Sequence, residues 1–169
     1  MGRVFNAIIN RMRKPLIWLS QRIHGKLLII LFWKLSGLHF KGREIRWGCY
    51  FDAPSKVYIG EGTFINYRNT FHTSNGTATI TIGENCDVAP DCMFMCTTHK
   101  IGNESRRAGE LEYAPIVIGD GCWIGARSVV LPGITIGNGC IIAAGSIVTK
   151  SFPDNCLLGG VPSRVIRML

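Results

Sequence analysis

Aliphatic residues recur every six positions along most of the chain. The longest run holds Ile118, Ile124, Val130, Ile136, Ile142 and Val148. Shorter runs, some slightly shifted in phase, hold Ile82, Val88 and Phe94; Ile59, Ile65 and Phe71; and Ile45, Phe51 and Val57. Neither the 3.6-residue period of a helix nor the alternation of a half-buried strand explains a period of six. Six-residue repeats are typical of stacked β-helix coils, each built from three short strands and three corners.

The segments between the aliphatic positions have the composition of tight corners. "IGDGCW", "IGNGCI", "IGENCD" and "IGEGTF" place Gly after the aliphatic residue and then Asp, Asn, Glu or Gly, which tolerate unusual backbone dihedrals. The chain has room for roughly five such coils, each burying its aliphatic residues against the next. An evenly spaced β-sandwich is the alternative, but its turn signals would recur every 8–12 residues.

Small residues occupy the fourth position after many of the aliphatic residues, and we expect them to fill interior corners. They include Cys86, Cys92, Cys122, Ser128, Cys140 and Ser146. The chain has seven cysteines and no CxxC spacing, so packing explains them better than disulfides or metal binding. An odd number of such cysteines also fits a reducing cytoplasm.

The segment "CMFMCTTHKIGNESRRAGELEYAP" interrupts the period, and we expect a loop protruding from a corner at about residues 97–115. His99 lies at the root of this loop. A neutral imidazole suits a general base near neutral pH, although a lone loop histidine is more often simply solvated. Cys96 should face inward, away from His99, which argues against a thiol nucleophile.

The stretch "IGDGCWIGARSVVLPGITIGNGCIIAAGSIVTKSFPDNCLLGGVPSRVIR" (118–167) resembles the hexapeptide-repeat acyltransferases, and the maltose and galactoside O-acetyltransferases in particular. The resemblance runs from about Val57 to Arg167, with the repeats, "TTH", "WIG", "TK" and "GVPSRVI" in order. It implies an all-β fold, a left-handed parallel β-helix. It also implies a homotrimer that transfers acetyl groups from acetyl-CoA at clefts between subunits, with no metal required.

The resemblance also implies roles for individual residues. His99 would be the general base, and Glu110 a carboxylate that could hold one nitrogen of its ring. Asn66 would lie near the acceptor or the oxyanion. Trp123 should point outward, as a wall of the acceptor cleft or as part of a subunit contact. A corner role for Asn66 and a solvated position for Glu110 remain alternatives.

Acetyl-CoA has a long pantetheine arm and three phosphates, so its site should be a groove with cations at one end. The resemblance places Ala126 and Ala144 along the arm and Thr149 and Lys150 beside it. The resemblance also places Arg164 and Arg167 near the phosphates. Some relatives have serine where this chain has Ala126, so a hydroxyl contact is lost there.

The first residues differ from the rest in charge and period. The whole chain carries a net charge of +8, residues 1–47 carry +9, and the remainder is close to neutral. Apolar residues at helical spacing, interrupted by Pro15 and Gly25, predict short amphipathic helices. "LLIILFW" (27–33) is too short to cross a bilayer, which needs about 20 residues. The segment either lies on an anionic membrane or caps the open end of the β-helix.

We therefore expect a basic N-terminal segment (1–40), a hexapeptide-repeat domain (41–155) and a C-terminal tail (156–169). The expected function is acetyl-CoA-dependent O-acetylation of a sugar hydroxyl in bacterial surface polysaccharide or lipopolysaccharide synthesis. The expected location is the cytoplasm, with peripheral contact to the inner membrane through residues 1–36. Charge confined to one end does not suggest a nucleic-acid groove.

Other functions stay open at this point. The acceptor could be an amine of an amino sugar or of a xenobiotic, and nothing in the residues separates a hydroxyl from an amine. A non-catalytic trimeric scaffold docked on a membrane is an alternative from another class. Metal-dependent carbonic anhydrases share the fold but need three histidines at one metal, and this chain has only His24, His39, His72 and His99.

Overall fold

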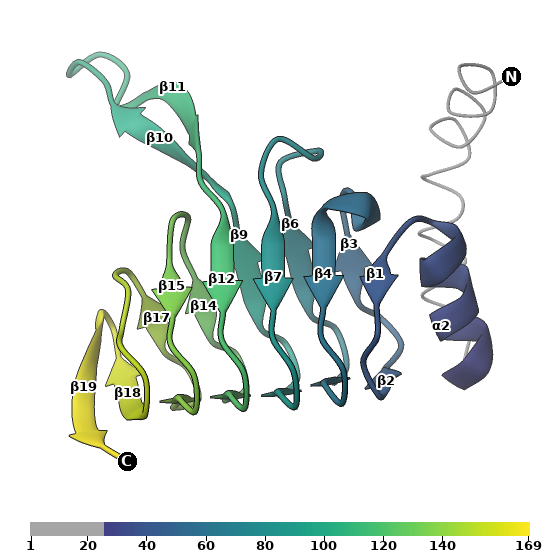
Figure 1. Ribbon diagram of the computed structural model, residues 1–169. Helices are drawn as coiled ribbons and strands as arrows, with labels where there is room; N and C mark the ends of the chain where they lie inside the picture. The colour runs from purple at the N-terminus through teal and green to yellow at the C-terminus, as the bar shows by residue number, and fades with distance from the viewer. Residues whose placement is uncertain (1–25) are drawn as a thin grey trace, which may run out of the picture.

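The computed structural model describes residues 26–169, and most of them form a triangular prism of stacked coils (Figure 1). Its first sheet contains β1 (His39–Phe40), β4 (Val57–Ile59), β7 (Ile80–Ile82), β12 (Ile116–Ile118) and β15 (Thr135–Ile136). The second contains β2 (Glu44–Ile45), β5 (Phe64–Ile65), β8 (Asp87–Val88), β13 (Trp123–Ile124), β16 (Ile141–Ile142), β18 (Cys156–Gly160) and β19 (Ser163–Met168). The third contains β3 (Tyr50–Phe51), β6 (Thr70–His72), β9 (Met93–Met95), β14 (Val129–Val130) and β17 (Ile147–Val148). We call these the first, second and third sheets.

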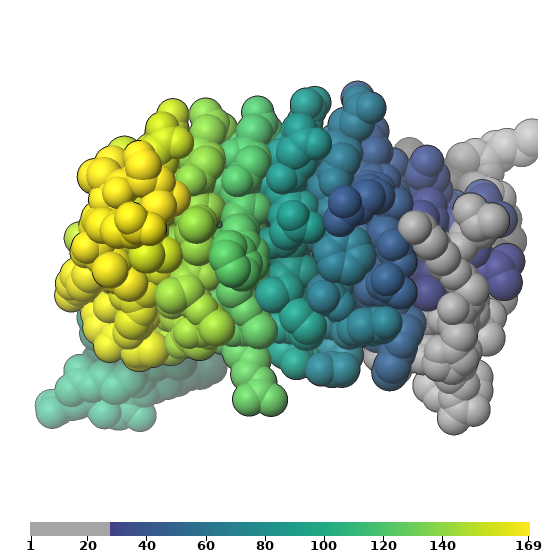
Figure 2. Space-filling view, turned by 90° about the horizontal axis from the view of Figure 1, so that it is seen from below, coloured from purple at the N-terminus to yellow at the C-terminus, as the bar shows by residue number. Residues whose placement is uncertain are grey.

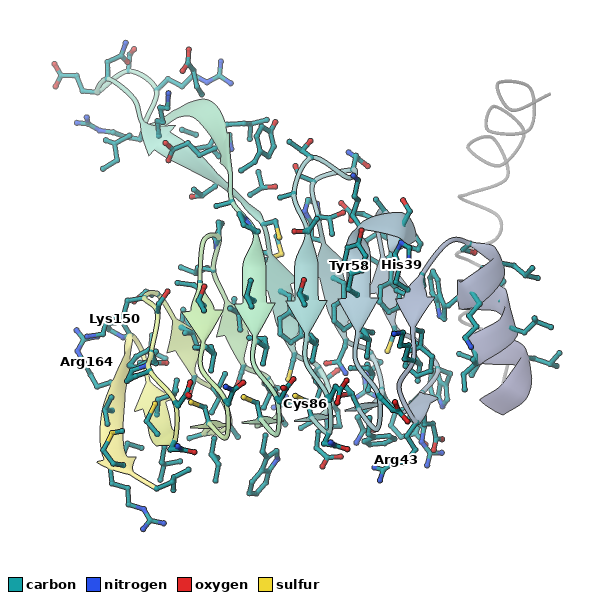
Figure 3. All side chains as sticks on the ribbon, viewed as in Figure 1. His39, Arg43, Tyr58, Cys86, Lys150 and Arg164 are labelled. Atoms are coloured by element: carbon teal, nitrogen blue, oxygen red, sulfur yellow. The ribbon has the colours of Figure 1, made fainter. Side chains whose placement is uncertain are left out.

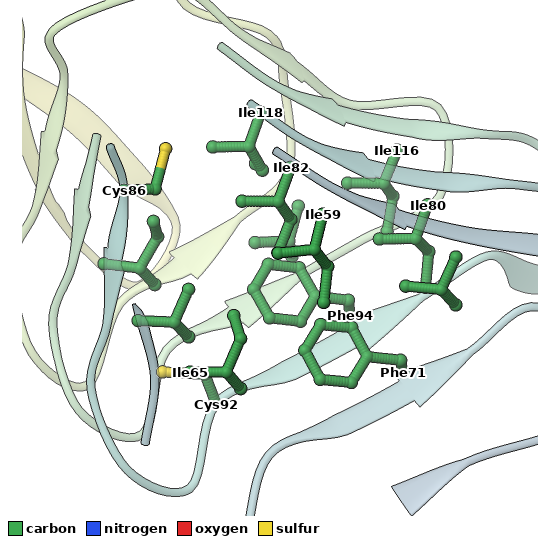
Figure 4. Close-up of a cluster of buried hydrophobic side chains, with 14 of the residues drawn as sticks. Ile59, Ile65, Phe71, Ile80, Ile82, Cys86, Cys92, Phe94, Ile116 and Ile118 are labelled. Atoms are coloured by element: carbon green, nitrogen blue, oxygen red, sulfur yellow. The ribbon is translucent and has the colours of Figure 1, made fainter. Parts of the chain in front are cut away.

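All strand pairs within the sheets are parallel except β18 with β19, and residues of the same phase lie opposite one another. Every aliphatic or aromatic residue predicted to point inward is at most 2% exposed. The rings of Phe51 and Phe71 stack at 4.5 Å. Those of Phe71 and Phe94, both labelled in Figure 4, stack at 5.1 Å. The β-helix predicted from the six-residue period is thus confirmed, with five strands in the first sheet.

The small corner residues are also buried as predicted. Ser128 and Ser146 are fully buried, and Ser128 Oγ donates to the Gly125 carbonyl oxygen at 2.7 Å. All seven cysteines are free and buried. Cys122 Sγ, for example, lies 3.1 Å from the carbonyl oxygen of Gly137 in the next coil. The cysteines therefore pack the corners and satisfy carbonyl groups there.

One helix covers the N-terminal end of the prism (Figure 1). In α2 (Lys26–Leu35), Ile29 and Trp33 are buried, and the Trp33 ring lies 4.6 Å from that of Phe51 in the first coil. Residues 26–35 thus cap the coil, as one of the two interpretations predicted. The helices predicted before Gly25 lie outside the described residues.

The C-terminal tail continues the second sheet. β18 pairs in parallel with β16, and β19 returns antiparallel to β18. The space-filling view shows these strands against the last coil, with the coils packed on one another along the prism (Figure 2). Residues expected to be a separate tail therefore share the sheet of the repeat domain.

A short 3-10 helix, η1 (Pro54–Lys56), occupies the first corner between the third and first sheets.

Candidate active site

The interruption in the six-residue period folds into a β-hairpin that projects from the prism (Figure 1). β10 (Thr97–Ile101) and β11 (Ala108–Tyr113) pair antiparallel, with His99 opposite Leu111 and Ile101 opposite Ala108. Two residues of β11 therefore face the single residue Lys100, which is a β-bulge. The predicted protrusion is confirmed, and it is built from paired strands.

His99 is held by the backbone of this hairpin. Its Nδ1 atom lies 2.9 Å from the carbonyl oxygen of Gly109, within the bulge. A carbonyl oxygen can only accept a hydrogen bond, so Nδ1 must carry the proton. In the neutral ring, Nε2 is then unprotonated and can accept one. The side chain is exposed, so this nitrogen is available to a substrate.

Glu110 pairs with Lys100, and not with His99, in this chain. Its carboxylate, with a side chain 82% exposed, pairs with Lys100 Nζ at 3.1 Å. Neighbouring residues of a strand point to opposite faces, so a partner of Lys100 lies across the hairpin from His99. In the single chain the Gly109 carbonyl, and not Glu110, therefore holds the imidazole, and a role of Glu110 in the site stays a prediction. The sequence carried no signal for Gly109 beyond a glycine in the excursion.

Cys96 faces the interior, as predicted. Its thiol is buried and lies 3.5 Å from the carbonyl oxygen of Thr79. Burial raises the pKa of this thiol to about 11. Because the thiolate is the nucleophilic form, Cys96 is poorly suited to form an acyl-enzyme.

Three of the predicted site residues, Asn66, Ala126 and Ala144, do not lie on the edge that carries the hairpin. They lie on the edge between the second and third sheets. Ala126 and Ala144 occupy neighbouring coils there, and the Gly145 N–H donates to the Ala126 carbonyl at 2.8 Å. Asn66 lies on the same edge, where its Oδ1 accepts from the Tyr67 N–H at 2.9 Å, as in a corner residue. His99 projects from the edge between the third and first sheets. One chain therefore does not bring these residues to His99.

Thr149 and Lys150 follow β17 and lie exposed on the same edge as the hairpin, two coils further on. Strands in a sheet are about 4.8 Å apart, so this separation is about 10 Å along the prism. Trp123 points outward from the second sheet and is 57% exposed, as predicted. Its position leaves both the cleft-wall and the subunit-contact interpretations open.

Two cations lie at the C-terminal end of the prism, where Figure 3 labels Lys150 and Arg164. Ser163 Oγ donates to the Ile147 carbonyl at 2.9 Å, which fastens the start of β19 to the last coil beside Arg164. Within residues 26–169, neither cation forms an ion pair. Arg167 pairs with Leu157, further along β19. Exposed, unneutralised cations at this end fit the phosphates of a coenzyme A molecule.

The described part of the chain contains no group of three His, Cys, Asp or Glu side chains arranged to hold a metal ion. None of its helices combines the length and apolar character needed to cross a bilayer.

The fold and the exposed hairpin histidine define a β-helix protein of the hexapeptide-repeat class. Residues 115–150 match the family model described as hexapeptide repeat of succinyl-transferase. The chain is 42% identical over 118 residues to the galactoside O-acetyltransferase of Escherichia coli K12, a match spanning 70% of this chain and 57% of that relative. This chain thus corresponds to little more than half of that relative's length.

Solved structures extend this comparison. A galactoside acetyltransferase in complex with coenzyme A superposes with a TM-score of 0.79 at 34% identity, over 92% of this chain and 78% of that one. A Vibrio cholerae hexapeptide-repeat acetyltransferase complexed with acetyl-CoA superposes with a TM-score of 0.83 at 27% identity. The match covers 96% of this chain and 88% of that one. The chain belongs to the hexapeptide-repeat acetyltransferase family of the galactoside and maltose type, and its fold is a left-handed parallel β-helix.

Proposed function

We propose that this protein is an acetyl-CoA-dependent O-acetyltransferase that acts on a sugar hydroxyl. The observation that carries the proposal is the His99 ring, exposed on the hairpin with Nδ1 held by the Gly109 carbonyl. Its support from similarity is the relatives named galactoside and maltose O-acetyltransferase. The acceptor class we favour is a unit of a bacterial surface polysaccharide or lipopolysaccharide.

In the proposed reaction, His99 Nε2 removes the proton of the acceptor hydroxyl as the oxygen attacks the acetyl carbonyl. Bound acetyl-CoA supplies the acetyl group as a thioester. The carbonyl–sulfur bond breaks, and the imidazolium returns its proton to the departing thiolate. The Gly109 carbonyl favours these proton transfers because it continues to accept a hydrogen bond from Nδ1–H when the ring is charged.

The proposal includes a homotrimer. His99 and the residues expected along the pantetheine arm, Ala126 and Ala144, lie on different edges of one prism. A site that uses both edges needs two copies, with the hairpin of one facing the other edge of its neighbour. Sedimentation equilibrium should then give three times the monomer mass.

The proposal also includes peripheral membrane contact, on the cytoplasmic face of the inner membrane. Leu28, Leu31 and Leu35 lie on the outer side of α2 and are exposed, opposite the buried Ile29 and Trp33. Residues 1–36 contain seven Lys or Arg and no acidic residue. An apolar stripe beside basic residues is the composition of segments that lie on anionic bilayers.

Cosedimentation with vesicles tests this contact. Wild-type protein should bind phosphatidylglycerol vesicles more strongly than phosphatidylcholine vesicles, and the double variant Leu31→Ser, Leu35→Ser should bind less. Val165→Ser changes an exposed apolar residue at the other end of the prism and serves as the control. Equal binding by all three proteins contradicts the membrane contact but leaves the enzyme proposal standing.

The enzyme proposal is tested by incubating the protein with acetyl-CoA and a panel of sugars and following the release of free thiol. His99→Ala should lower kcat by about 10²–10⁴-fold, the usual contribution of a general base. His39→Ala is the matched control, since His39 is exposed on the first sheet and stacks on Tyr58 at 4.4 Å (Figure 3). Full activity of His99→Ala would refute the assignment. A product stable to mild alkali would indicate an amide, and therefore an amine acceptor.

A further inference from the structure

A buried carboxylate lies on the edge that carries the hairpin. Asp52 is 3% exposed, and its Oδ1 accepts from the Thr73 N–H at 2.8 Å and from the Thr73 hydroxyl at 2.6 Å. Oδ1 also accepts from the Ala53 N–H at 2.7 Å, and Oδ2 accepts from the Asn75 N–H at 2.7 Å. This carboxylate therefore fixes the loop between β6 and β7 to the preceding coil.

The ring of His72 lies beside this carboxylate. Its Nδ1 atom is 3.8 Å from Asp52 Oδ2 and is buried without a hydrogen-bond partner among the described residues. The side chain as a whole is 35% exposed, so the exposure belongs to the rest of the ring. A negative charge next to Nδ1 favours the tautomer with the proton on that nitrogen. Nε2 is then a free acceptor, the same polarity that the Gly109 carbonyl imposes on His99.

His72 stands at the foot of the hairpin. It lies opposite Met95 in the third sheet, and the Cys96 N–H donates to its carbonyl oxygen at 2.9 Å. Thr97, the first residue of β10, has a buried hydroxyl that also lacks a hydrogen-bond partner among residues 26–169. Buried polar atoms in native proteins nearly always have a partner. His72 at the end of β6 and Thr97 at the start of β10 thus place two buried, unpaired polar atoms at the root of the hairpin that carries His99.

The two histidines are too far apart to bind the same hydroxyl. His72 is one strand spacing, about 4.8 Å, from Met95, and His99 is four extended residues beyond Met95, roughly 13 Å of strand. Both lie on one edge of one chain, so a saccharide whose reacting hydroxyl meets His99 can place another hydroxyl near His72.

We infer that His72, oriented by Asp52, is an acceptor-binding residue that determines specificity: its Nε2 accepts a hydrogen bond from an acceptor hydroxyl other than the one that is acetylated. The inference rests on the proposed function, because it takes the acceptor to be a saccharide. A site that pairs with a hydroxyl discriminates against acceptors that lack it, since His72 Nε2, desolvated by the bound acceptor, is then left unpaired. His72 is therefore a binding residue, and Asp52 is a positioning residue.

Steady-state kinetics of two substitutions provide the first test. His72→Phe removes the acceptor nitrogen and should raise the acceptor KM about tenfold, which corresponds to about 1.4 kcal/mol. The values of kcat and of the KM for acetyl-CoA should stay near wild type. His72→Gln keeps a polar group and should restore most of the acceptor affinity. His39→Phe, on the first sheet, is the matched control and should change none of these values.

The kinetic result that would overturn the inference is an unchanged acceptor KM in His72→Phe. An equal loss in all parameters, accompanied by a lower Tm, would also overturn it, because that pattern indicates a purely structural role. The measurement should therefore include thermal unfolding of every variant.

Histidine NMR gives a readout that does not need turnover. The chain has four histidines, so their ring signals can be assigned with single substitutions. Methyl β-galactoside, lactose and maltotriose are then added in the presence of coenzyme A. Shifts of both the His72 and His99 signals, with His39 unchanged, support the inference. Shifts of His99 alone refute it and leave the proposed function standing, whereas no shift of either with any saccharide refutes both.

Discussion

The Nδ1 atom of His99 lies 2.9 Å from the carbonyl oxygen of Gly109, so a backbone group within a β-bulge orients the proposed base. This arrangement differs from one in which a carboxylate side chain holds the imidazole. A backbone carbonyl stays in place as long as the hairpin stays paired, and it carries no charge of its own. The orientation of His99 therefore depends on the geometry of the bulge.

Replacing Gly109 should disturb this geometry. A Cβ atom at Gly109 would come 2.9 Å from the Lys100 carbonyl oxygen and 3.3 Å from Gly102 Cα, so the backbone must shift in Gly109→Ala. Misplacing a catalytic group by a fraction of an ångström lowers the rate, and we expect kcat to fall between about ten- and a hundredfold. Affinity for coenzyme A, measured by calorimetry, should not change. Glu112→Ala on the same strand is the control, and wild-type kcat in Gly109→Ala would contradict the role of the bulge.

Glu110→Gln distinguishes the geometry of this chain from the expectation based on family resemblance. Because Glu110 pairs with Lys100 at the surface, its loss should change kcat by no more than about fivefold, within the range of exposed ion pairs. If the carboxylate holds the His99 ring in the assembled protein, kcat should instead fall by several orders of magnitude. The kcat of Glu110→Gln therefore decides whether Glu110 only pairs with Lys100 or also holds the His99 ring.

The cations at the C-terminal end should act on the phosphates of the donor. The double variant Lys150→Ala, Arg164→Ala should raise the KM for acetyl-CoA at least tenfold, since charge-assisted contacts to phosphate are among the stronger hydrogen bonds. The KM for acetyl-pantetheine, which lacks the nucleotide phosphates, should be the same as in wild type. Arg43→Ala, which removes an exposed cation near the other end, is the control. Equal increases for both donors would contradict this assignment.

Asp52 should make stability depend on pH. Burial tends to raise the pKa of this carboxyl, but hydrogen bonds from Thr73 and Asn75 and the nearby His72 ring outweigh it and lower the pKa below the ordinary 3.8. Because the pKa of Asp52 is lower in the folded protein than in the unfolded chain, the ionised carboxylate stabilises the fold above pH 3.8. This stability is lost as the pH falls through the pKa of Asp52 in the folded protein. Asp52→Asn should cost about 1–3 kcal/mol at pH 7, because buried donors lose a charged acceptor.

Chemical denaturation at several pH values measures this effect. The difference between wild type and Asp52→Asn should shrink as the pH falls below 3.8. Asp91→Asn is the comparison, since the exposed Arg68 pair also lowers the pKa of Asp91. Its stability loss should be smaller and should disappear at high salt. A pH-independent difference for Asp52→Asn would contradict the prediction.

The stacked phenylalanines should carry much of the stability of the N-terminal coils. Phe71 lies between Phe51 and Phe94, and Phe71→Ala should lower the free energy of unfolding by about 3–5 kcal/mol through the cavity it leaves. Met93→Ala, on the outer face of the same sheet, should have little effect. Urea denaturation measures both, and similar values for the two variants would argue against a core held by this stack.

The fold could be predicted from the sequence because its information is local and repeated. Each inward residue meets residues of the same phase in the two neighbouring coils, as Ile118 meets Ile82 in the preceding coil and Ile136 in the following one. A six-residue period therefore specifies which side chains are buried and which strands pair. The exposed position of His99 followed in the same way, since an interruption of the period must leave the prism at a corner.

The contacts within the site came only from the tertiary structure. The Gly109 carbonyl reaches His99 through antiparallel pairing and a bulge, and the pairing of Glu110 with Lys100 follows from the same register. Asp52 lies beside His72 of the neighbouring coil, and Trp33 of α2 packs on Phe51. Neither contact belongs to the six-residue repeat. Where the six-residue pattern stops, backbone pairing between segments decides which polar groups meet, and the order of residues along the chain does not reveal that pairing.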